Sequence, residues 1–308
     1  MNLSDYPRDM VGYANKPIYP KWPNKAKITL QFVLNYEEGG ENCILHGDEG
    51  SETFLSDMFQ PQSFKNQRHQ SIETLYEYGS RVGVWRILEL FKSFEVPITI
   101  FGVATALQRN SKVAEYLAKN NYDICSHGYK WINYQNISSE IEEEHLYKSI
   151  EIIKELMGKR PIGWYTGRDS EQTRKLVLKE GGFLYDSDAY NDDLPYFVEG
   201  LNQNKHLVIP YTMDTNDMRF VAPGFTHSEQ FFQYLKDSFD TLYFEGQNGT
   251  PKMMNIGMHC RILGKPGRIV AMKKFLEYVR SFDDVWFATR EQIATHWIKN
   301  FKDMEIRI

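Results

Sequence analysis

The chain has few cysteines and no arrangement that would tie them together. Cys43, Cys125 and Cys260 are the only cysteines in 308 residues, and no C-x-x-C pair occurs. Three thiols cannot all pair within one chain, which fits a reducing compartment. No apolar stretch is long enough to cross a bilayer, and the first residues lack the apolar segment of a signal peptide. We therefore expect a cytoplasmic protein with no membrane partner.

The sequence also lacks an excess of positive charge. Its 36 Lys and Arg residues are outnumbered by 41 Asp and Glu residues, the net charge is −5, and no basic stripe occurs. A nucleic acid is therefore not expected as a partner. The chain contains no glycine-rich phosphate loop and no G-x-S-x-G nucleophile elbow. These absences argue against nucleotide chemistry and against a serine-hydrolase mechanism.

What the chain does have is a repeated alternation of short β-type runs with amphipathic helical segments. The apolar fraction of 42% and the charged fraction of 25% are ordinary for a soluble globular protein. Strands are predicted at residues 28–34, 96–103, 122–126, 161–165, 183–185, 206–211, 254–258 and 284–288. Helices are predicted at residues 83–94, 111–120, 138–157, 170–180, 228–243, 268–282 and 289–301.

This alternation implies parallel strands joined by right-handed crossovers. Seven or eight such units in about 300 residues predict a single-domain α/β barrel, with a doubly wound open sheet as the alternative. We predict an N-terminal arm packed on the barrel over residues 1–27 and the barrel domain over residues 28–308. The segment Glu41–Ser80 shows little periodicity, and it is the best candidate for a loop that closes a site.

A carboxylate pair, Glu37 and Glu38, ends the first predicted strand. Like charges this close resist joint ionisation, so one pKa is expected to rise, and a carboxylate with a raised pKa suits a general base near neutral pH. In a parallel barrel the carboxyl ends of the strands meet at one face. Other polar residues expected at that face are His127, Tyr165, Arg168, Asp186, Asp188, Asp217, His259 and Arg261. Acid, His and Arg together predict hydrolysis by general acid–base catalysis, with water as the nucleophile.

The order of four motifs resembles the polysaccharide deacetylase family. The motifs are Tyr36-Glu37-Glu38-Gly39, His127-Gly128-Tyr129, the stretch from Tyr185 to Asp193, and Met258-His259. The resemblance implies a distorted (β/α)7 barrel and a hydrolase that acts on carbon–nitrogen bonds. In that family the first motif is an Asp pair that supplies a base and a metal ligand. The second motif supplies two metal-binding His residues four positions apart, and the last supplies a His that acts as general acid.

This chain departs from the family pattern where the metal would bind. Both acids of the first motif are Glu, and the position four residues after His127 is Trp131, whose indole N–H is only a donor. Zn²⁺ needs three protein ligands, so no metal residue and no cofactor are expected. These departures match the cofactor-independent allantoinase branch of the family. The chain resembles that branch over nearly its whole length, including the motifs Tyr6-Pro7-Arg8-Asp9 and Gly163–Arg168. That resemblance implies metal-independent hydrolysis of allantoin to allantoate in purine catabolism by a homo-oligomer, a tetramer.

The resemblance also implies roles for single residues. Glu37, at the family's base position, would activate water, with Glu38 as the next candidate. Arg168 would stabilise the oxyanion, and His259 would protonate the leaving nitrogen. The expected substrate-binding residues are Glu38, His127, Trp131, Tyr165 and Asp188. The alternatives are that Asp186 and Asp188 only cap a helix or turn, and that Arg168 pairs structurally with Glu37 or Asp188. At the level of function, the alternatives are an N-deacetylase of acetylated glycans, another carbon–nitrogen hydrolase of this fold, and a non-enzymatic barrel that binds a small polar ligand.

Overall fold

The first strand, β1 (Ile28–Tyr36), is buried along its whole length. The computed structural model describes residues 7–222 and 224–304. Strand β1 pairs in parallel with β8 (Lys252–His259) on one side. On its other side it pairs with β2 (Thr99–Gly102) near its carboxyl end and with β9 (Val285–Phe287) near its amino end. A strand covered on both faces reads as a continuous apolar run, which is how this one was predicted.

The remaining strands continue the sheet from β2 in chain order. They are β3 (Asp123–Ser126), β4 (Gly163–Trp164), β5 (Tyr185–Asp186) and β7 (Lys205–Val208), all parallel. Strand β6 (Tyr196–Glu199) was not predicted, and it runs antiparallel to β7. The order β6-β7-β5-β4-β3-β2-β1-β8 does not reverse as a doubly wound sheet would. A bridge between Asn216 and Gly257 brings the segment after β7 beside β8, so the sheet curls toward closure. The predicted distorted (β/α)7 barrel is confirmed.

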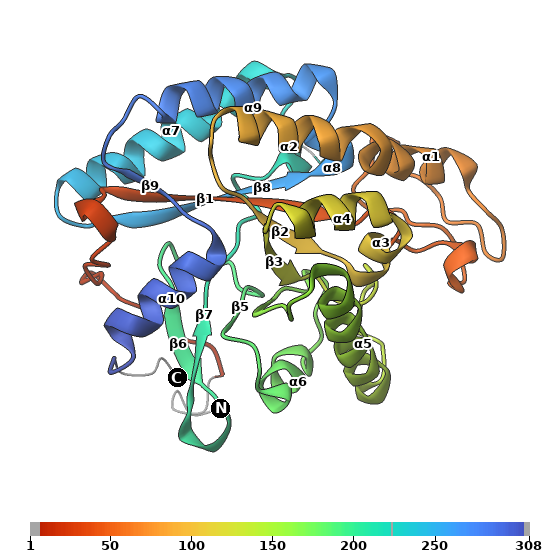
Figure 1. Ribbon diagram of the computed structural model, residues 1–308, viewed down its shortest axis with the longest axis horizontal. Helices are drawn as coiled ribbons and strands as arrows, with labels where there is room; N and C mark the ends of the chain where they lie inside the picture. Colours follow the sequence, from red (N-terminus) through yellow and green to blue (C-terminus); the bar gives the residue numbers. More distant parts are fainter. Residues whose placement is uncertain (1–6, 223, 305–308) are drawn as a thin grey trace.

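The helices cover the outside of the curled sheet (Figure 1). They are α1 (Gln70–Tyr78), α2 (Val84–Ser93), α3 (Ala104–Arg109), α4 (Ser111–Lys119), α5 (Ser139–Met157), α6 (Thr173–Glu180), α7 (Ser228–Gln247), α8 (Cys260–Leu263), α9 (Pro266–Val279) and α10 (Arg290–Phe301). All seven predicted helices are present. Helices α1, α3 and α8 were not predicted, and α1 lies inside the segment that was expected to be a loop. In the described part of the chain, no helix combines the length and the apolarity needed to span a bilayer.

The alternation of side chains along β1 divides the core in two. Leu30, Phe32 and Leu34 point outward into the larger apolar cluster, beneath α2, α7 and α9. Val33 points inward to a second cluster that includes Phe101 and reaches α10. The inner face of β1 continues with Asn35 and then, just past the strand, with Glu37, because side chains alternate with a period of two. The fold thus directs the first acid of the pair toward the interior of the barrel.

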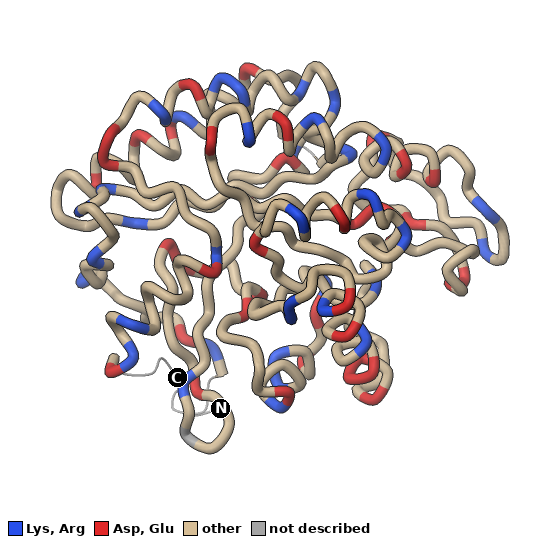
Figure 2. The backbone as a smooth tube through the Cα atoms, viewed as in Figure 1, with Lys and Arg blue, Asp and Glu red and all other residues tan. Residues whose placement is uncertain are grey.

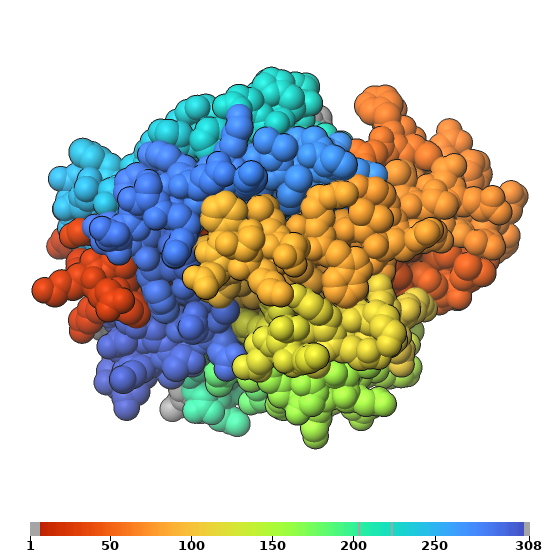
Figure 3. Space-filling model, turned by 45° about the horizontal axis from the view of Figure 1, so that its top comes forward, coloured from red at the N-terminus to blue at the C-terminus, as the bar shows by residue number. Residues whose placement is uncertain are grey.

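Two segments lie outside this repeat. The described part of the predicted N-terminal arm contacts the barrel, where Trp22 packs against Trp286 and Trp297 with ring centroids 5.6 and 5.7 Å apart. Residues 1–6, which include Tyr6 of the Tyr6–Asp9 motif, lie outside the described residues. The segment around residues 45–70 forms a lobe at one end of the molecule, orange in Figure 3. Acidic and basic residues are interspersed along the part of the backbone that the structure describes (Figure 2).

Candidate active site

The ends of several strands surround a small cavity at the carboxyl-terminal mouth of the barrel. Its volume is about 80 Å³. Most of the predicted site residues line it: Glu37, His127, Trp131, Tyr165, Arg168 and His259. Asn35, Tyr211 and Asn216, together with Phe54 and Leu55 of the 41–80 segment, complete much of the wall. Part of the 41–80 segment thus lies against this cavity, and its role as the loop that closes the site stays a prediction.

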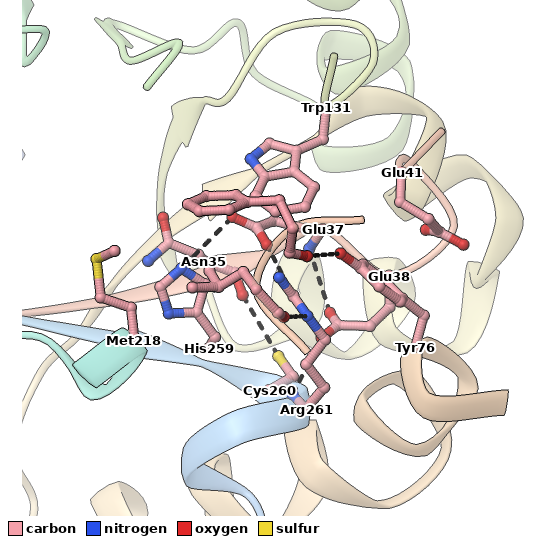
Figure 4. A network of polar contacts seen from close by, with 12 residues as sticks. Asn35, Glu37, Glu38, Glu41, Tyr76, Trp131, Met218, His259, Cys260 and Arg261 are labelled. Atoms are coloured by element: carbon pink, nitrogen blue, oxygen red, sulfur yellow. Dashed lines mark hydrogen bonds and ion pairs between the residues drawn. The ribbon is translucent and has the colours of Figure 1, made fainter. Parts of the chain in front are cut away.

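Glu37 lies at the centre of the polar contacts (Figure 4). Its Oε1 atom is 3.3 Å from His127 Nε2 and 3.6 Å from His259 Nε2, and its Oε2 atom is 2.7 Å from Arg261 Nη1. The side chain is 1% exposed. Burial alone would raise the pKa of Glu37, but Arg261 and the two histidines hold that pKa well below its ordinary value. Glu37 is therefore an ionised carboxylate.

Glu38 turns away from the cavity toward the backbone. Its Oε1 atom accepts from Arg261 N at 3.1 Å and from Arg261 Nη1 at 3.3 Å, and its Oε2 atom accepts from Glu37 N at 3.2 Å. Burial raises the pKa of Glu38, despite the nearby Arg261. One pKa of the pair is thus raised as expected, but it is not that of the predicted base. Among the residues described, Glu38 is not part of the cavity wall, so the contacts correct its expected place beside the substrate.

Arg261 follows His259 in the sequence by two residues, and no role was expected for it. It is 2% exposed, and its Nε donates to Leu55 O at 2.9 Å. Its guanidinium lies over the Tyr76 ring at 4.3 Å and near the Trp131 ring at 5.0 Å. The sequence did contain a signal for this role. Two adjacent carboxylates that are buried need a cation nearby, and Arg261 comes two residues after His259, at the end of the same strand.

His259 is held by a second acid. Asp217, which is fully buried, lies 2.6 Å from His259 Nδ1 and accepts from His259 N at 2.7 Å. This fixes Nδ1 as a donor and leaves Nε2 facing Glu37. Burial would lower the pKa of His259, but Asp217 and Glu37 raise it above its ordinary value. The ring is therefore suited to carry a proton, as a general acid must.

The sequence left open the alternative that Arg168 pairs with Glu37 or Asp188. The structure shows a different partner for its guanidinium. Its Nη1 and Nη2 atoms donate to Glu52 at 3.1 and 3.2 Å, and its guanidinium lies 3.8 Å from the centre of the Trp131 ring. Glu52 was missed because it lies in the segment without periodicity, 116 residues from its partner. Trp131 lines the cavity, and the guanidinium groups of both Arg168 and Arg261 lie near its ring.

Asp188 lies behind the wall of the cavity. Its carboxylate accepts from Thr166 N and Gly167 N at 2.8 to 2.9 Å, and burial raises its pKa to about 7. These contacts favour the alternative in which Asp188 holds the turn that carries Tyr165 and Arg168. The expected direct contact with substrate is thereby corrected. Asp186 also has a structural place, because it lies 2.9 Å from Arg174 and 3.0 Å from His206.

The donor set does not fit a metal ion. Glu37 and Glu38 both face the Arg261 guanidinium, which would compete with any cation for their oxygens. Trp131 stands where a second His would be needed, and within residues 7–222 and 224–304 no group of three His, Cys, Asp or Glu side chains is arranged to hold a metal. The three cysteines lie free and buried in the described chain.

Comparisons with known proteins agree with this architecture. The polysaccharide deacetylase family model matches residues 64–183. The crystal structure of PuuE allantoinase is 54% identical, covers 97% of this chain and 99% of its own, and has a TM-score of 0.95. A probable polysaccharide deacetylase from Pseudomonas aeruginosa PAO1 is 56% identical, covers 96% and 99%, and has a TM-score of 0.93. A Schizosaccharomyces pombe protein provisionally named a polysaccharide deacetylase is 46% identical over 94% of this chain and 96% of its own.

Proposed function

The chain belongs to the polysaccharide deacetylase family, and we propose that it is a member that hydrolyses the ring amide of allantoin to give allantoate. It is a hydrolase by this relationship. The substrate is supported by the 54% identity with PuuE allantoinase over almost the whole of both chains. The proposed reaction belongs to purine and urate catabolism and needs no metal.

One observation carries the metal-independent part of the proposal. The buried Arg261 guanidinium lies 2.7 Å from Glu37 and 3.3 Å from Glu38. It supplies a fixed positive charge to both carboxylates that a metal-dependent relative would use as base and ligand. An Arg cannot lose its proton in a protein, so this charge is permanent. With this charge in place, Glu37 can act as the base and Glu38 as the carboxylate beside it, and neither has to bind a metal ion.

We assign the proton transfers to Glu37 and His259. Glu37, ionised, would take a proton from a water that attacks the ring carbonyl carbon. His259, protonated and oriented by Asp217, would give a proton to the ring nitrogen as the carbon–nitrogen bond breaks. The depressed pKa of Glu37 and the raised pKa of His259 place both groups in the required protonation states near neutral pH.

The cavity walls suit a small flat ring. Trp131, Phe54 and Tyr165 supply aromatic faces, and Arg168 supplies N–H groups toward the carbonyl on which negative charge develops. His127 Nε2, which shares Glu37 Oε1 with His259, would help to orient the water or the substrate.

The main alternative is removal of acetyl groups from glycans, which the names of two relatives favour. A substrate comparison separates the two. The purified protein is incubated with allantoin and, separately, with an acetylated chitooligosaccharide, and allantoate and acetate are quantified. We expect allantoate and no acetate. Acetate release without loss of allantoin would overturn the assignment, and no turnover of either compound would favour a binding role.

We further propose a cytoplasmic homotetramer. The free thiols fit a reducing compartment, and the resemblance to the allantoinase branch supports the oligomer. Light scattering on the purified protein should report four times the chain mass of 36.2 kDa. A mass equal to one chain would contradict the tetramer.

A further inference from the structure

We propose that Glu52 is a positioning residue that both orients and neutralises Arg168, so that the site prefers a neutral amide over an anionic carboxylate. This inference rests on the proposed function, since it concerns how the same site distinguishes allantoin from allantoate. Allantoin is uncharged near neutral pH, whereas allantoate carries the carboxylate that hydrolysis creates. An arginine without a partner in a small cavity would favour the product over the substrate.

The first support is the geometry of the ion pair. Glu52 Oε2 accepts from Arg168 Nη1 at 3.1 Å, and Glu52 Oε1 accepts from Nη2 at 3.2 Å. The two side chains are 4% and 12% exposed, so solvent screens the pair little. A two-point contact of this kind sets the plane of the guanidinium as well as its charge. That plane lies against the Trp131 ring at 3.8 Å.

The second support is that Glu52 is itself held rigidly. Thr53 N and Phe54 N each donate to Glu52 Oε1 at 3.0 Å, and Asn42 Nδ2 donates to Oε2 at 2.8 Å. The backbone of Glu52 donates to Asn42 O at 2.9 Å. Because these contacts fix the Glu52 carboxylate within its own loop, Glu52 can fix the position of Arg168.

The third support is that the same loop contacts Arg261, which pairs with Glu37. Leu55 O accepts from Arg261 Nε at 2.9 Å, and Tyr76 OH donates to Phe54 O at 3.0 Å. Phe54 and Leu55 line the cavity together with Arg168. Glu52 therefore joins the covering segment to the arginine that faces the substrate, and it touches neither the reacting atoms nor Glu37 in the described structure.

The charge balance gives the expected selectivity. With Glu52 ionised, the Arg168–Glu52 pair has no net charge, so Arg168 offers directed N–H donors to a carbonyl without attracting an anion strongly. Replacing Glu52 by Gln keeps the size of the side chain and leaves an uncompensated cation beside the cavity. Neutral ligands should then bind more weakly because Arg168 is less well oriented, and carboxylates should bind more tightly.

The test compares wild type, Glu52→Gln and Glu49→Gln, a variant of an exposed acid in the same segment that pairs with Lys65 at 3.5 Å. The measurements are the KM for allantoin and the inhibition constant for allantoate. In Glu52→Gln we expect KM to rise roughly tenfold and the inhibition constant to fall roughly tenfold, as for the gain or loss of one charge-assisted contact. Glu49→Gln should match wild type. A folded Glu52→Gln enzyme with an unchanged or raised inhibition constant would overturn the inference.

Two further arms keep the result interpretable. The double variant Glu52→Gln/Arg168→Gln removes both charges and should lose the gain in allantoate binding, whereas a merely structural effect would persist. Glu52→Ala, which also removes the negative charge, serves if Glu52→Gln does not fold. If wild type fails to hydrolyse allantoin, the proposed function fails on its own. Calorimetric binding of neutral hydantoin and anionic hydantoin-5-acetate then decides the inference, which predicts that Glu52→Gln shifts the preference toward the anion.

Discussion

At the scale of single residues, Arg261 makes the carboxylate pair possible. Removing a carboxylate from water costs several kcal/mol, and Glu37 and Glu38 are 1% and 2% exposed. The planar guanidinium offers donors to both acids and to Leu55 O at once. A Lys has a single charged centre and could not make the same set of contacts. Arg261 therefore serves stability and the ionisation of Glu37 together.

We predict that Arg261→Gln lowers the free energy of unfolding by about 3–5 kcal/mol, because it leaves buried carboxylates without their cation. Urea unfolding followed by circular dichroism measures this change. Arg81→Gln is a matched control, because the Arg81 side chain is 77% exposed and lies 3.9 Å from Glu77. It should unfold like wild type. An Arg261→Gln protein as stable as the control would contradict the role assigned to this residue.

Glu37→Gln should lower kcat by about 10²- to 10⁴-fold, the usual contribution of a positioned general base. The change removes the charge and keeps the size, so the thermal midpoint should change little beside the loss of activity. Steady-state kinetics with allantoin, checked by calorimetric melting, measures both. If kcat stays near the wild-type value, Glu37 is not the base and Glu38 becomes the candidate.

The pH profile of kcat/KM should be bell-shaped. Activity requires Glu37 ionised and His259 protonated, so it falls when pH drops below the lowered pKa of Glu37 and when pH rises above the raised pKa of His259. The alkaline limb should therefore lie above the ordinary His value of 6.5. Asp217→Asn removes a cause of that raised pKa and should move the alkaline limb to lower pH. If the alkaline limb of the Asp217→Asn variant stays at the wild-type pH, the limb does not report the ionisation of His259.

The sequence could identify residues by position but not all of their partners. Glu37, His127 and His259 follow apolar strands directly, and parallel strands bring such positions to one face. Glu52 and Arg261 were harder to assign, because their contacts join segments 116 and 223 residues apart. No local pattern encodes that distance. The one indication of Arg261 was that Glu37 and Glu38, at the end of a buried strand, would need a cation beside them.

At the scale of elements, a close approach between two helical segments places Arg261. The π-helical turn Gly79–Gly83 follows α1 and packs against α8, which begins directly after His259. A Cβ atom on Gly83 would lie 2.0 Å from Cys260 O. Glycine is therefore required here by space rather than by backbone conformation. The contact holds the backbone at Cys260, next to both His259 and Arg261.

We predict that Gly83→Ala lowers stability by about 1–3 kcal/mol, as overpacking does, and lowers kcat as well because Arg261 is displaced. Gly267→Ala in α9 is the matched control, since nothing lies within 4 Å of its Cβ position. That change should leave kcat unaltered. Thermal melting and steady-state kinetics on both variants measure the difference. Equal kinetics in the two variants would show that this contact does not set the site.

Elements with strong local signals were predictable from the sequence. Helix α5 begins after Ser138, whose side chain accepts from Ile141 N, and it ends at Gly158 in the left-handed conformation. Strand β6 gave no comparable signal, because it is a four-residue edge strand whose last two residues are not buried. Helix α1 was missed because only Ile72 and Tyr76 of its nine residues are buried. Tertiary contacts, rather than periodicity, stabilise both elements.

At the scale of the whole molecule, the barrel brings together residues that are distant in the chain. The order of its parallel strands places Glu37, His127 and His259 around one cavity, and the 41–80 segment covers it with Phe54 and Leu55. The repeat of strands and helices predicted a barrel with a doubly wound open sheet as the alternative, and the resemblance to the deacetylase family implied the distorted (β/α)7 form. The path of the 41–80 segment could not be predicted in this way, because ion pairs and backbone contacts, rather than a periodic sequence pattern, determine it. We propose that this segment, through Glu52, sets the selectivity of the site.

The central claim is that Arg261, rather than a metal ion, supplies the charge beside the catalytic pair. The most direct measurement is the rate of allantoate formation by protein treated with a chelator, with bound metal quantified by mass spectrometry on the same sample. We predict full kcat at less than about one metal ion per ten chains, and no increase when Zn²⁺ is added, since a structural or catalytic zinc would need three free ligands. Activity that disappears with the chelator and returns in proportion to bound Zn²⁺ would contradict it.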